Sequence, residues 1–172
     1  MKGNKHMKAL IVIDMQNDFI DGSLGTKEAV AIVPVVKKLI DDGDYHKLIF
    51  TRDTHEDNYL FTQEGQNLPV KHCIKNTHGW KIHEDLDTSM ADAIINKSSF
   101  GWTGWNTILN RMDEIILVGL CTDICVISNA LIIKAFYPET KVSIIEDATA
   151  GVTPELKAAA LETAKSCQIH II

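Results

Sequence analysis

The sequence predicts an α/β protein: a three-layer sandwich built on a six-stranded, mostly parallel, Rossmann-like sheet. Six short runs rich in β-branched residues recur along the chain, and they are continuously apolar rather than alternating. Continuous apolarity is typical of parallel strands that are covered on both faces. Helical patterns separate most of these runs, as βαβ units require. The length of 172 residues, with no repeat or linker, predicts a single domain over residues 1–172.

Each apolar run is expected to form one strand. In chain order the expected strands are Lys8–Asp14, Lys47–Asp53, Ala93–Ser98, Glu114–Leu120, Lys141–Asp147 and Gln168–Ile172.

Four helices are expected between these strands. The first has Pro34 in its first turn and Gly43 as its stop. The second follows apolar residues at helical spacing from Trp105 to Met112, and the third is the nearly all-apolar, buried stretch Ile124–Phe136. The fourth opens at Thr153, a cap residue followed by proline. The apolar face of the first helix consists of Val35, Val36, Leu39 and Ile40.

The segment Thr54–Asp92 departs from this alternation. It is polar, rich in histidine and acidic residues, and weakly periodic. A segment of this length without clear elements is usually either functional or disordered. Tyr59, Phe61 and Trp80 favour packing over disorder, so we expect a functional excursion from the sheet.

Composition and charge exclude several classes of protein. Hydrophobic residues make up 45% and charged residues 23% of the chain, as in ordinary soluble domains. The net charge of −6 argues against nucleic-acid binding, which requires a basic surface, and no apolar stretch is long enough to span a membrane. Four cysteines without a secretion signal predict reduced thiols in the cytoplasm. Residues 1–7, "MKGNKHM", are either a natural extension or a tag remnant.

Three reactive residues follow different strands. Asp14 closes the first strand, Lys97 follows a middle strand, and Cys125 comes just after "EIILVGL". Taken singly, they could be a turn residue, a solvated charge and a small core residue. In an open parallel sheet, however, ligands bind beyond the carboxyl ends of the strands, so their shared location predicts one site.

Of the two neighbouring cysteines, Cys125 has the stronger case as a nucleophile. Thr122 or Asp123 is expected to cap the helix, which places Cys125 among the unpaired amides of the first turn. That end of a helix favours a thiolate, and its amides could bind an oxyanion. Cys121 ends the strand and has no such environment. The C-x-x-x-C spacing is neither a C-x-x-C redox motif nor half of a paired zinc site.

Three segments resemble the isochorismatase-like cysteine hydrolases, and within them the nicotinamidases. They are "IDMQNDF" (Ile13–Phe19), "NKSSF" (Asn96–Phe100) and "GLCTDICV" (Gly119–Val126).

The resemblance extends in order from about Lys8 to the C-terminus and implies the isochorismatase-like hydrolase fold. It also implies that Asp14, Lys97 and Cys125 form a catalytic triad, with the backbone amides of Cys121 and Cys125 as the oxyanion hole. A non-proline cis peptide is expected at Leu120–Cys121.

A second cluster resembles the nicotinamidase metal site. "RDTHEDNYLFTQEG" and "LPVKHC" supply Asp53, His55 and His72, with Glu64 where some nicotinamidases have a fourth ligand. Asp53 and His55, at i and i+2, leave a strand end on the same side and can reach one ion. These ligands suit one divalent ion: zinc, manganese or iron. The alternative is a set of ordinary polar loop residues.

Two departures from the family pattern bear on the substrate. Pro69 replaces an aromatic residue before the last metal histidine, and the segment after Lys97 is short. Phe19 and Trp102 are the expected aromatic residues of the substrate pocket. Both departures alter the pocket wall, so the substrate is less well determined than the chemistry.

The predicted reaction is hydrolysis of a small carboxamide through a thioester, with nicotinamide giving nicotinate and ammonia. The alternatives are an N-carbamoyl amidase, an isochorismatase, or a non-enzymatic metal-binding domain. That last domain would use the ligands His72, Cys73, Cys121 and Cys125. The expected partner is a small-molecule amide, with no nucleic acid and no membrane, and the family resemblance implies a homo-oligomer.

Overall fold

The computed structural model describes residues 6–172, so most of segment 1–7 lies outside the described residues. Six strands form one sheet in the order β3-β2-β1-β4-β5-β6, and all five strand pairings are parallel. The strands are β1 (Lys8–Ile13), β2 (Lys47–Asp53), β3 (Ala93–Lys97), β4 (Glu114–Leu120), β5 (Lys141–Ala150) and β6 (His170–Ile171). The predicted α/β fold with a Rossmann-like sheet is therefore confirmed. The direction of the strand order reverses between β1 and β4, which is where such sheets bind ligands.

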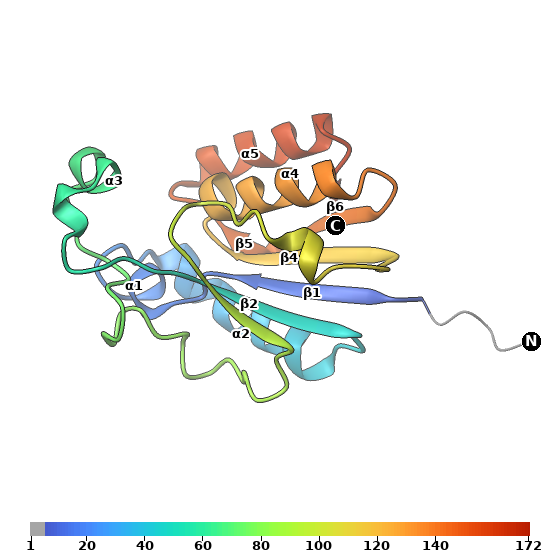
Figure 1. The fold of residues 1–172 in the computed structure, drawn as a ribbon, viewed down its shortest axis with the longest axis horizontal. Helices are drawn as coiled ribbons and strands as arrows, with labels where there is room; N and C mark the ends of the chain where they lie inside the picture. Colours follow the sequence, from blue (N-terminus) through green and yellow to red (C-terminus); the bar gives the residue numbers. More distant parts are fainter. Residues whose placement is uncertain (1–5) are drawn as a thin grey trace, which may run out of the picture.

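Helices cover both faces of the sheet (Figure 1), which gives three layers. The α-helices are α1 (Asn17–Ile20), α2 (Lys27–Asp42), α3 (Gln63–Asn67), α4 (Ile127–Phe136) and α5 (Pro154–Ser166). Short 3-10 turns occur at η1 (Tyr59–Phe61) and η2 (Trp105–Thr107), and η3 (Thr122–Val126) is a π-helical turn. None of these helices is long and apolar enough to cross a membrane.

Alternate residues of β1 enter two separate cores. Ile11 and Ile13 pack in the core under α4 and α5, whereas Leu10 and Val12 pack in the core under α2. All four side chains have no exposed surface. A strand whose two faces are both buried has no polar positions, and this explains the continuous apolar runs.

Helix α2 differs from the prediction at its start. It begins seven residues before Pro34, after Thr26, whose side chain accepts a hydrogen bond from the Ala29 amide at 3.0 Å. Pro34 lies inside the helix, where its missing N–H leaves the carbonyl of Val30 without a helical partner. Both residues are exposed, so water can reach that carbonyl. The buried face consists of Ala29, Ile32, Val33 and Val36, whereas Val35 is exposed.

The predicted helix from Trp105 to Met112 is wrong, because only the turn η2 forms there. Trp105, Leu109 and Met112 are nevertheless buried in the core below α4. Their spacing therefore reflects burial rather than a helix. Arg111 adopts a left-handed backbone with φ of 64°, a conformation that a right-handed helix cannot contain.

The excursion over residues 54–92 is packed, as expected. It carries η1 and α3. The isolated bridge Gln16–Ile82 ties it to the body of the molecule, and the bridge His55–Ile74 joins two parts of the excursion itself. Tyr59 and Trp80 are buried, but Phe61 is 84% exposed and contributes nothing to the packing. Figure 1 shows α3 standing away from the sheet beyond its carboxyl edge.

Candidate active site

The three reactive residues predicted from the sequence lie together at the switch between β1 and β4. Asp14 follows β1, Lys97 ends β3, and Cys125 lies in η3 after β4. The Lys97 Nζ atom is 2.6 Å from Asp14 Oδ2 and 3.4 Å from Cys125 Sγ. Their exposed fractions are only 0%, 2% and 4% for Asp14, Lys97 and Cys125. A carboxylate, an ammonium group and a thiol thus share one buried site.

Thr51 on β2 holds Asp14, and the sequence reasoning missed it. The Thr51 hydroxyl donates to Asp14 Oδ1 at 2.6 Å and accepts from the Asp14 amide at 3.2 Å. The backbone of Asp14 is left-handed, with φ of 46°, a conformation that aspartate tolerates better than most residues. A hydroxyl directly after the buried apolar residues 48–50 of β2 was the available signal.

The turn after β4 has an unusual hydrogen-bond register. The Cys121 carbonyl accepts from the amides of Ile124 and Val126, both at 3.1 Å. In a regular α-helix this carbonyl would accept from the amide four residues on, which is that of Cys125. The π-helical register passes over the Cys125 amide. Such π-turns occur frequently at functional sites.

This turn also corrects the predicted helix start. Cys121, rather than Thr122 or Asp123, is the residue before the helical turn, and the Leu120–Cys121 peptide is cis, as the resemblance implied. Gly119 precedes it with φ of 110°, and a Cβ atom there would lie 2.1 Å from the Ile13 carbonyl oxygen. Only glycine permits this close approach of β4 to β1.

Burial controls the protonation of the three groups. It raises the pKa of the Cys125 thiol well above its ordinary value; Asp14 adds to this rise, and Lys97 opposes it. Burial also raises the pKa of Asp14 against the effect of Lys97. For Lys97, burial opposes the charge, but the nearby Asp14 and Cys125 raise its pKa. Burial of the whole site therefore opposes the thiolate that the helix end and Lys97 favour.

Cys121, the other cysteine near the turn, also has a raised pKa. Burial raises the pKa of Cys121 to about 12, with Asp123 and Asp14 acting in the same direction. All four cysteines are free thiols.

The four predicted metal ligands also lie together. One donor atom from each of Asp53, His55, Glu64 and His72 lies within 4.8 Å of all the others. His55 Nε2 is 2.9 Å from Asp53 Oδ2, and His72 Nε2 is 3.6 Å from both Asp53 Oδ2 and Glu64 Oε1. The Val70 carbonyl lies 2.8 Å from His72 Nδ1, so Nδ1 carries the proton, and the lone pair of Nε2 is available to bind a metal ion.

The chemistry of this cluster fits a divalent cation. Burial raises the pKa of Glu64, and Asp53 adds to it, because the two carboxylates share one small space. Although burial opposes its charge, the adjacent His55 and His72 hold the pKa of Asp53 far below its ordinary value. Mixed carboxylate and imidazole donors are a common set for zinc, manganese and iron. Asp53 Oδ1 lies 3.5 Å from Lys97 Nζ, so the cluster and the reactive group are adjacent.

Gln16 positions this cluster, and the sequence reasoning gave it no role. Its side-chain amide donates to the carbonyls of Asp53 at 2.9 Å and Trp80 at 2.8 Å, and its Oε1 accepts from the Asp53 amide at 2.7 Å. Asp18 Oδ2 accepts from the Cys73 amide at 2.7 Å, next to His72. The polar residues of "IDMQNDF" therefore fasten the excursion to the sheet.

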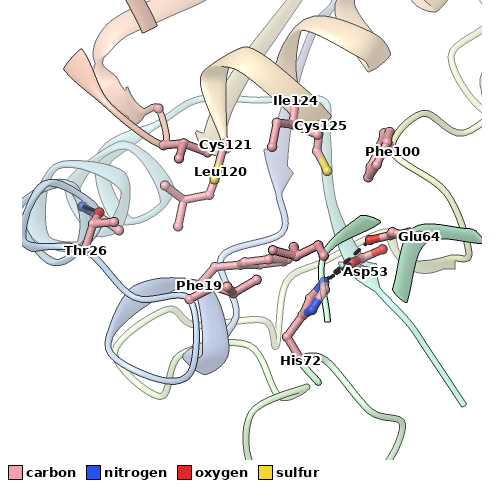
Figure 2. A pocket seen from close by; sticks show the side chains of 15 residues that line it. Phe19, Thr26, Asp53, Glu64, His72, Phe100, Leu120, Cys121, Ile124 and Cys125 are labelled. Atoms are coloured by element: carbon pink, nitrogen blue, oxygen red, sulfur yellow. Dashed lines mark hydrogen bonds and ion pairs between the residues drawn. The ribbon is translucent and has the colours of Figure 1, made fainter. Parts of the chain in front are cut away.

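One cavity of about 280 Å³ joins both groups. Figure 2 shows Cys125, Phe19 and the group of Asp53, Glu64 and His72 around the same space. Phe100 rather than Trp102 lies at its wall, because the Trp102 ring packs edge-on against Trp105, with centroids 4.9 Å apart. Leu68, beside the unusual Pro69, also lines the cavity.

The fold and site together define a parallel α/β protein with a buried cysteine, lysine and aspartate at the switch point of its sheet. The chain belongs to the isochorismatase family, since the model of the isochorismatase domain matches residues 8–172. The family resemblance seen in the motifs is thereby confirmed.

Three relatives illustrate the range of similarity. The nicotinamidase/pyrazinamidase of Mycobacterium tuberculosis is 30% identical over 96% of this chain and 98% of its own. The pyrazinamidase of Pyrococcus horikoshii, solved in complex with zinc, is 31% identical with a TM-score of 0.81, covering 96% of this chain and 98% of its own. The N-carbamoylsarcosine amidase of Thermoplasma acidophilum is 26% identical with a TM-score of 0.78, covering 96% of this chain and 95% of its own.

Proposed function

We propose that this protein is a cysteine amidohydrolase that converts nicotinamide into nicotinate and ammonia through a thioester on Cys125. The observation that carries this proposal is the contact of Lys97 Nζ with both Asp14 and Cys125. Cys125 lines a cavity that is also lined by three of the four metal-type ligands. The nicotinamidase relatives support the same substrate class.

In the first half of the reaction, the thiol of Cys125 adds to the amide carbon of the substrate. The thiol proton passes to Asp14, a sulfur–carbon bond forms, and the carbonyl becomes an oxyanion. Asp14 then delivers the proton to the departing nitrogen, the carbon–nitrogen bond breaks, and ammonia leaves. Since burial raises the pKa of the Cys125 thiol, the step requires a base beside the sulfur, and we assign that role to Asp14.

In the second half, water cleaves the thioester. Asp14 accepts a proton from the water, the hydroxide oxygen bonds to the acyl carbon, and the carbon–sulfur bond breaks as Asp14 returns the proton to the sulfur. Nicotinic acid leaves and ionises to nicotinate in water. Lys97 stabilises the charges that develop on the sulfur and on Asp14. We assign the oxyanion to the backbone amides of Cys121 and Cys125. The π-helical register supports this assignment, because the Cys121 carbonyl accepts from the amides of Ile124 and Val126 rather than from that of Cys125.

We propose that Asp53, His55, Glu64 and His72 hold one divalent ion, either zinc, manganese or iron. When bound there, the ion would supply a Lewis acid for the ring nitrogen of the substrate and so orient the ring. Phe19 and Phe100 would provide the apolar walls for that ring. The Phe19 and His72 ring centroids are 5.5 Å apart.

The alternatives have unequal support. The N-carbamoylsarcosine amidase neighbour favours testing N-carbamoyl compounds as well as nicotinamide. Isochorismate hydrolysis needs no thiol and leaves Cys125 unexplained. The non-enzymatic domain would use His72 with three cysteines, but within residues 6–172 the only group of metal-type ligands found contains no cysteine.

An ammonia-release assay tests the proposal. The protein is incubated with nicotinamide, pyrazinamide and N-carbamoylsarcosine, with and without a chelator. We expect nicotinamide to give the highest kcat/KM, and Cys125→Ala to abolish the release. Preference for N-carbamoylsarcosine, or ammonia release that survives Cys125→Ala, would overturn the assignment.

We also propose, from the family resemblance, that the chain forms a homo-oligomer, and, from its four free cysteines, that it acts in the cytoplasm. Size-exclusion chromatography with light scattering measures the first property, and a molar mass equal to the 19.1 kDa chain would refute it.

A further inference from the structure

Asn129 on α4 uses the full hydrogen-bonding capacity of its side chain. It has no exposed surface. Its Oδ1 accepts from the Trp102 amide and from Trp105 Nε1, both at 2.9 Å. Its Nδ2 donates to the Phe100 carbonyl at 3.0 Å and to the Cys125 carbonyl at 2.7 Å. A carboxamide has two acceptor sites and two donor protons, so all four are occupied and the orientation of the amide is determined.

These four bonds join two parts of the candidate active site. One partner is Cys125, one helical turn earlier, and the other three belong to residues 100–105. This segment follows Lys97, and the Lys97 Nζ atom donates to the Ser99 carbonyl at 3.2 Å. Apart from the turn η2, the segment has no regular secondary structure. Its conformation therefore depends on side-chain contacts such as these.

The segment also lies closely against α4. A Cβ atom at Gly101 would come within 2.4 Å of Ile132 Cδ1, so the backbone there touches the helix. Phe100, held through its carbonyl, lines the cavity. Movement of the segment relative to α4 would displace both the cavity wall and the Ser99 carbonyl that contacts Lys97.

We propose that Asn129 is a positioning residue, which sets the distance between the Cys125 sulfur and the Lys97 ammonium by fastening residues 100–105 to the helix of the nucleophile. It touches neither the substrate nor the reacting atoms. The inference rests on the proposed roles of Cys125 and Lys97. An asparagine in a nearly all-apolar helix is the sequence feature that marks it.

The test compares Asn129→Ala with Ile133→Ala. Ile133 is fully buried on the same helix, one turn further from Cys125, and its side chain makes no bond to residues 100–105. We expect both variants to lose thermal stability, but only Asn129→Ala to lower kcat, by about 10- to 100-fold, as displaced catalytic groups do. An equal loss of kcat in both variants, or in neither, would assign Asn129 a structural role alone.

A second readout does not depend on the substrate. The rate of iodoacetamide alkylation at Cys125 is measured by mass spectrometry, with the exposed Cys167 as an internal reference in the same sample. Since Lys97 attracts the developing thiolate, Lys97→Ala should slow alkylation of Cys125. Asn129→Ala should slow it too, and the double variant should be no slower than Lys97→Ala alone.

The outcomes separate the two proposals. If the native protein releases ammonia from no amide, the proposed function fails. The comparison of alkylation rates in the single and double variants still decides the role of Asn129. A native alkylation rate in Asn129→Ala, or effects that multiply in the double variant, would overturn the positioning role. If Asn129→Ala does not fold, Asn129→Asp replaces it. This variant keeps the shape and the Oδ1 contacts but turns an oxygen toward the carbonyls of Phe100 and Cys125.

Discussion

Replacing Lys97 by methionine should destabilise the protein in a pH-dependent way. Lys97→Met keeps an unbranched side chain of similar length but removes the charge 2.6 Å from the fully buried Asp14. Burial already raises the pKa of Asp14 while Lys97 opposes the rise. Without Lys97, the carboxylate has to bind a proton in the folded state, because an unpaired buried charge is far more costly.

The cost of that proton sets the magnitude. An aspartate in the unfolded chain has a pKa of about 3.9, and each pH unit above it costs about 1.4 kcal/mol when the folded state requires the neutral form. The penalty is therefore about 4 kcal/mol at pH 7 and about 1.5 kcal/mol at pH 5. The sign follows from linkage: a raised folded-state pKa leaves stability intact below the unfolded pKa and reduces it as pH rises. For a chain of this length, 4 kcal/mol corresponds to a fall in Tm of about 8–16 °C.

Urea unfolding followed by circular dichroism at pH 5, 6 and 7 measures this effect. The control is the double variant Asp14→Asn/Lys97→Met, which has no carboxylate to neutralise. It should be more stable than Lys97→Met at pH 7, and its difference from the native protein should change little with pH. A stability loss in Lys97→Met that is equal at pH 5 and pH 7, or further destabilisation in the double variant, would refute the reasoning.

Three further predictions concern the reaction, the cluster and the sheet. In the ammonia assay, Cys125→Ala and Asp14→Asn should each lower turnover by orders of magnitude. The double variant should be hardly worse than either, because the two groups act as a unit. Cys121→Ala should lower turnover only slightly. His72→Ala should release the bound divalent ion, measured by plasma mass spectrometry, and impair nicotinamide hydrolysis. Although burial opposes its charge, neighbouring lysines lower the pKa of Glu114, so its stabilising effect is lost as pH falls. Glu114→Gln should therefore be less stable than the native protein at pH 7, with a difference that shrinks below about pH 4 in urea unfolding.

Each of these has a result that would count against it. Near-complete inactivation by Cys121→Ala would mean that the nucleophile is the other cysteine. The exposed His78 supplies the matched control for His72, and equal metal loss in His78→Ala would place the ion elsewhere. For Glu114, a difference that is constant from pH 7 to pH 3 would show that its charge is not responsible.

Several features of this protein follow from the sequence because their physical causes are local. Continuous apolar runs require burial on both faces, so all six strands were placed within about two residues at their starts and five of the six at their ends. The last strand is shorter and β5 longer than predicted. The cap at Thr153 followed by proline marks the start of α5, and its hydroxyl accepts from the Leu156 amide. Strand-end residues converge at the carboxyl edge of any parallel sheet, so Asp14, Lys97 and Cys125 could be grouped in advance.

Other features depend on contacts between residues distant in the chain, and only the tertiary structure decided them. The apolar residues from Trp105 to Met112 have helical spacing, yet their side chains are buried in the core with α4 although no α-helix forms there. The protonation of Cys125 could not be inferred from its place near a helix end, because the opposing effect is burial by the whole fold. Thr51, Gln16 and Asn129 each form a hydrogen bond with a residue at least 24 positions away in the chain. A single sequence states which side chains can form hydrogen bonds, but the fold determines which groups they meet.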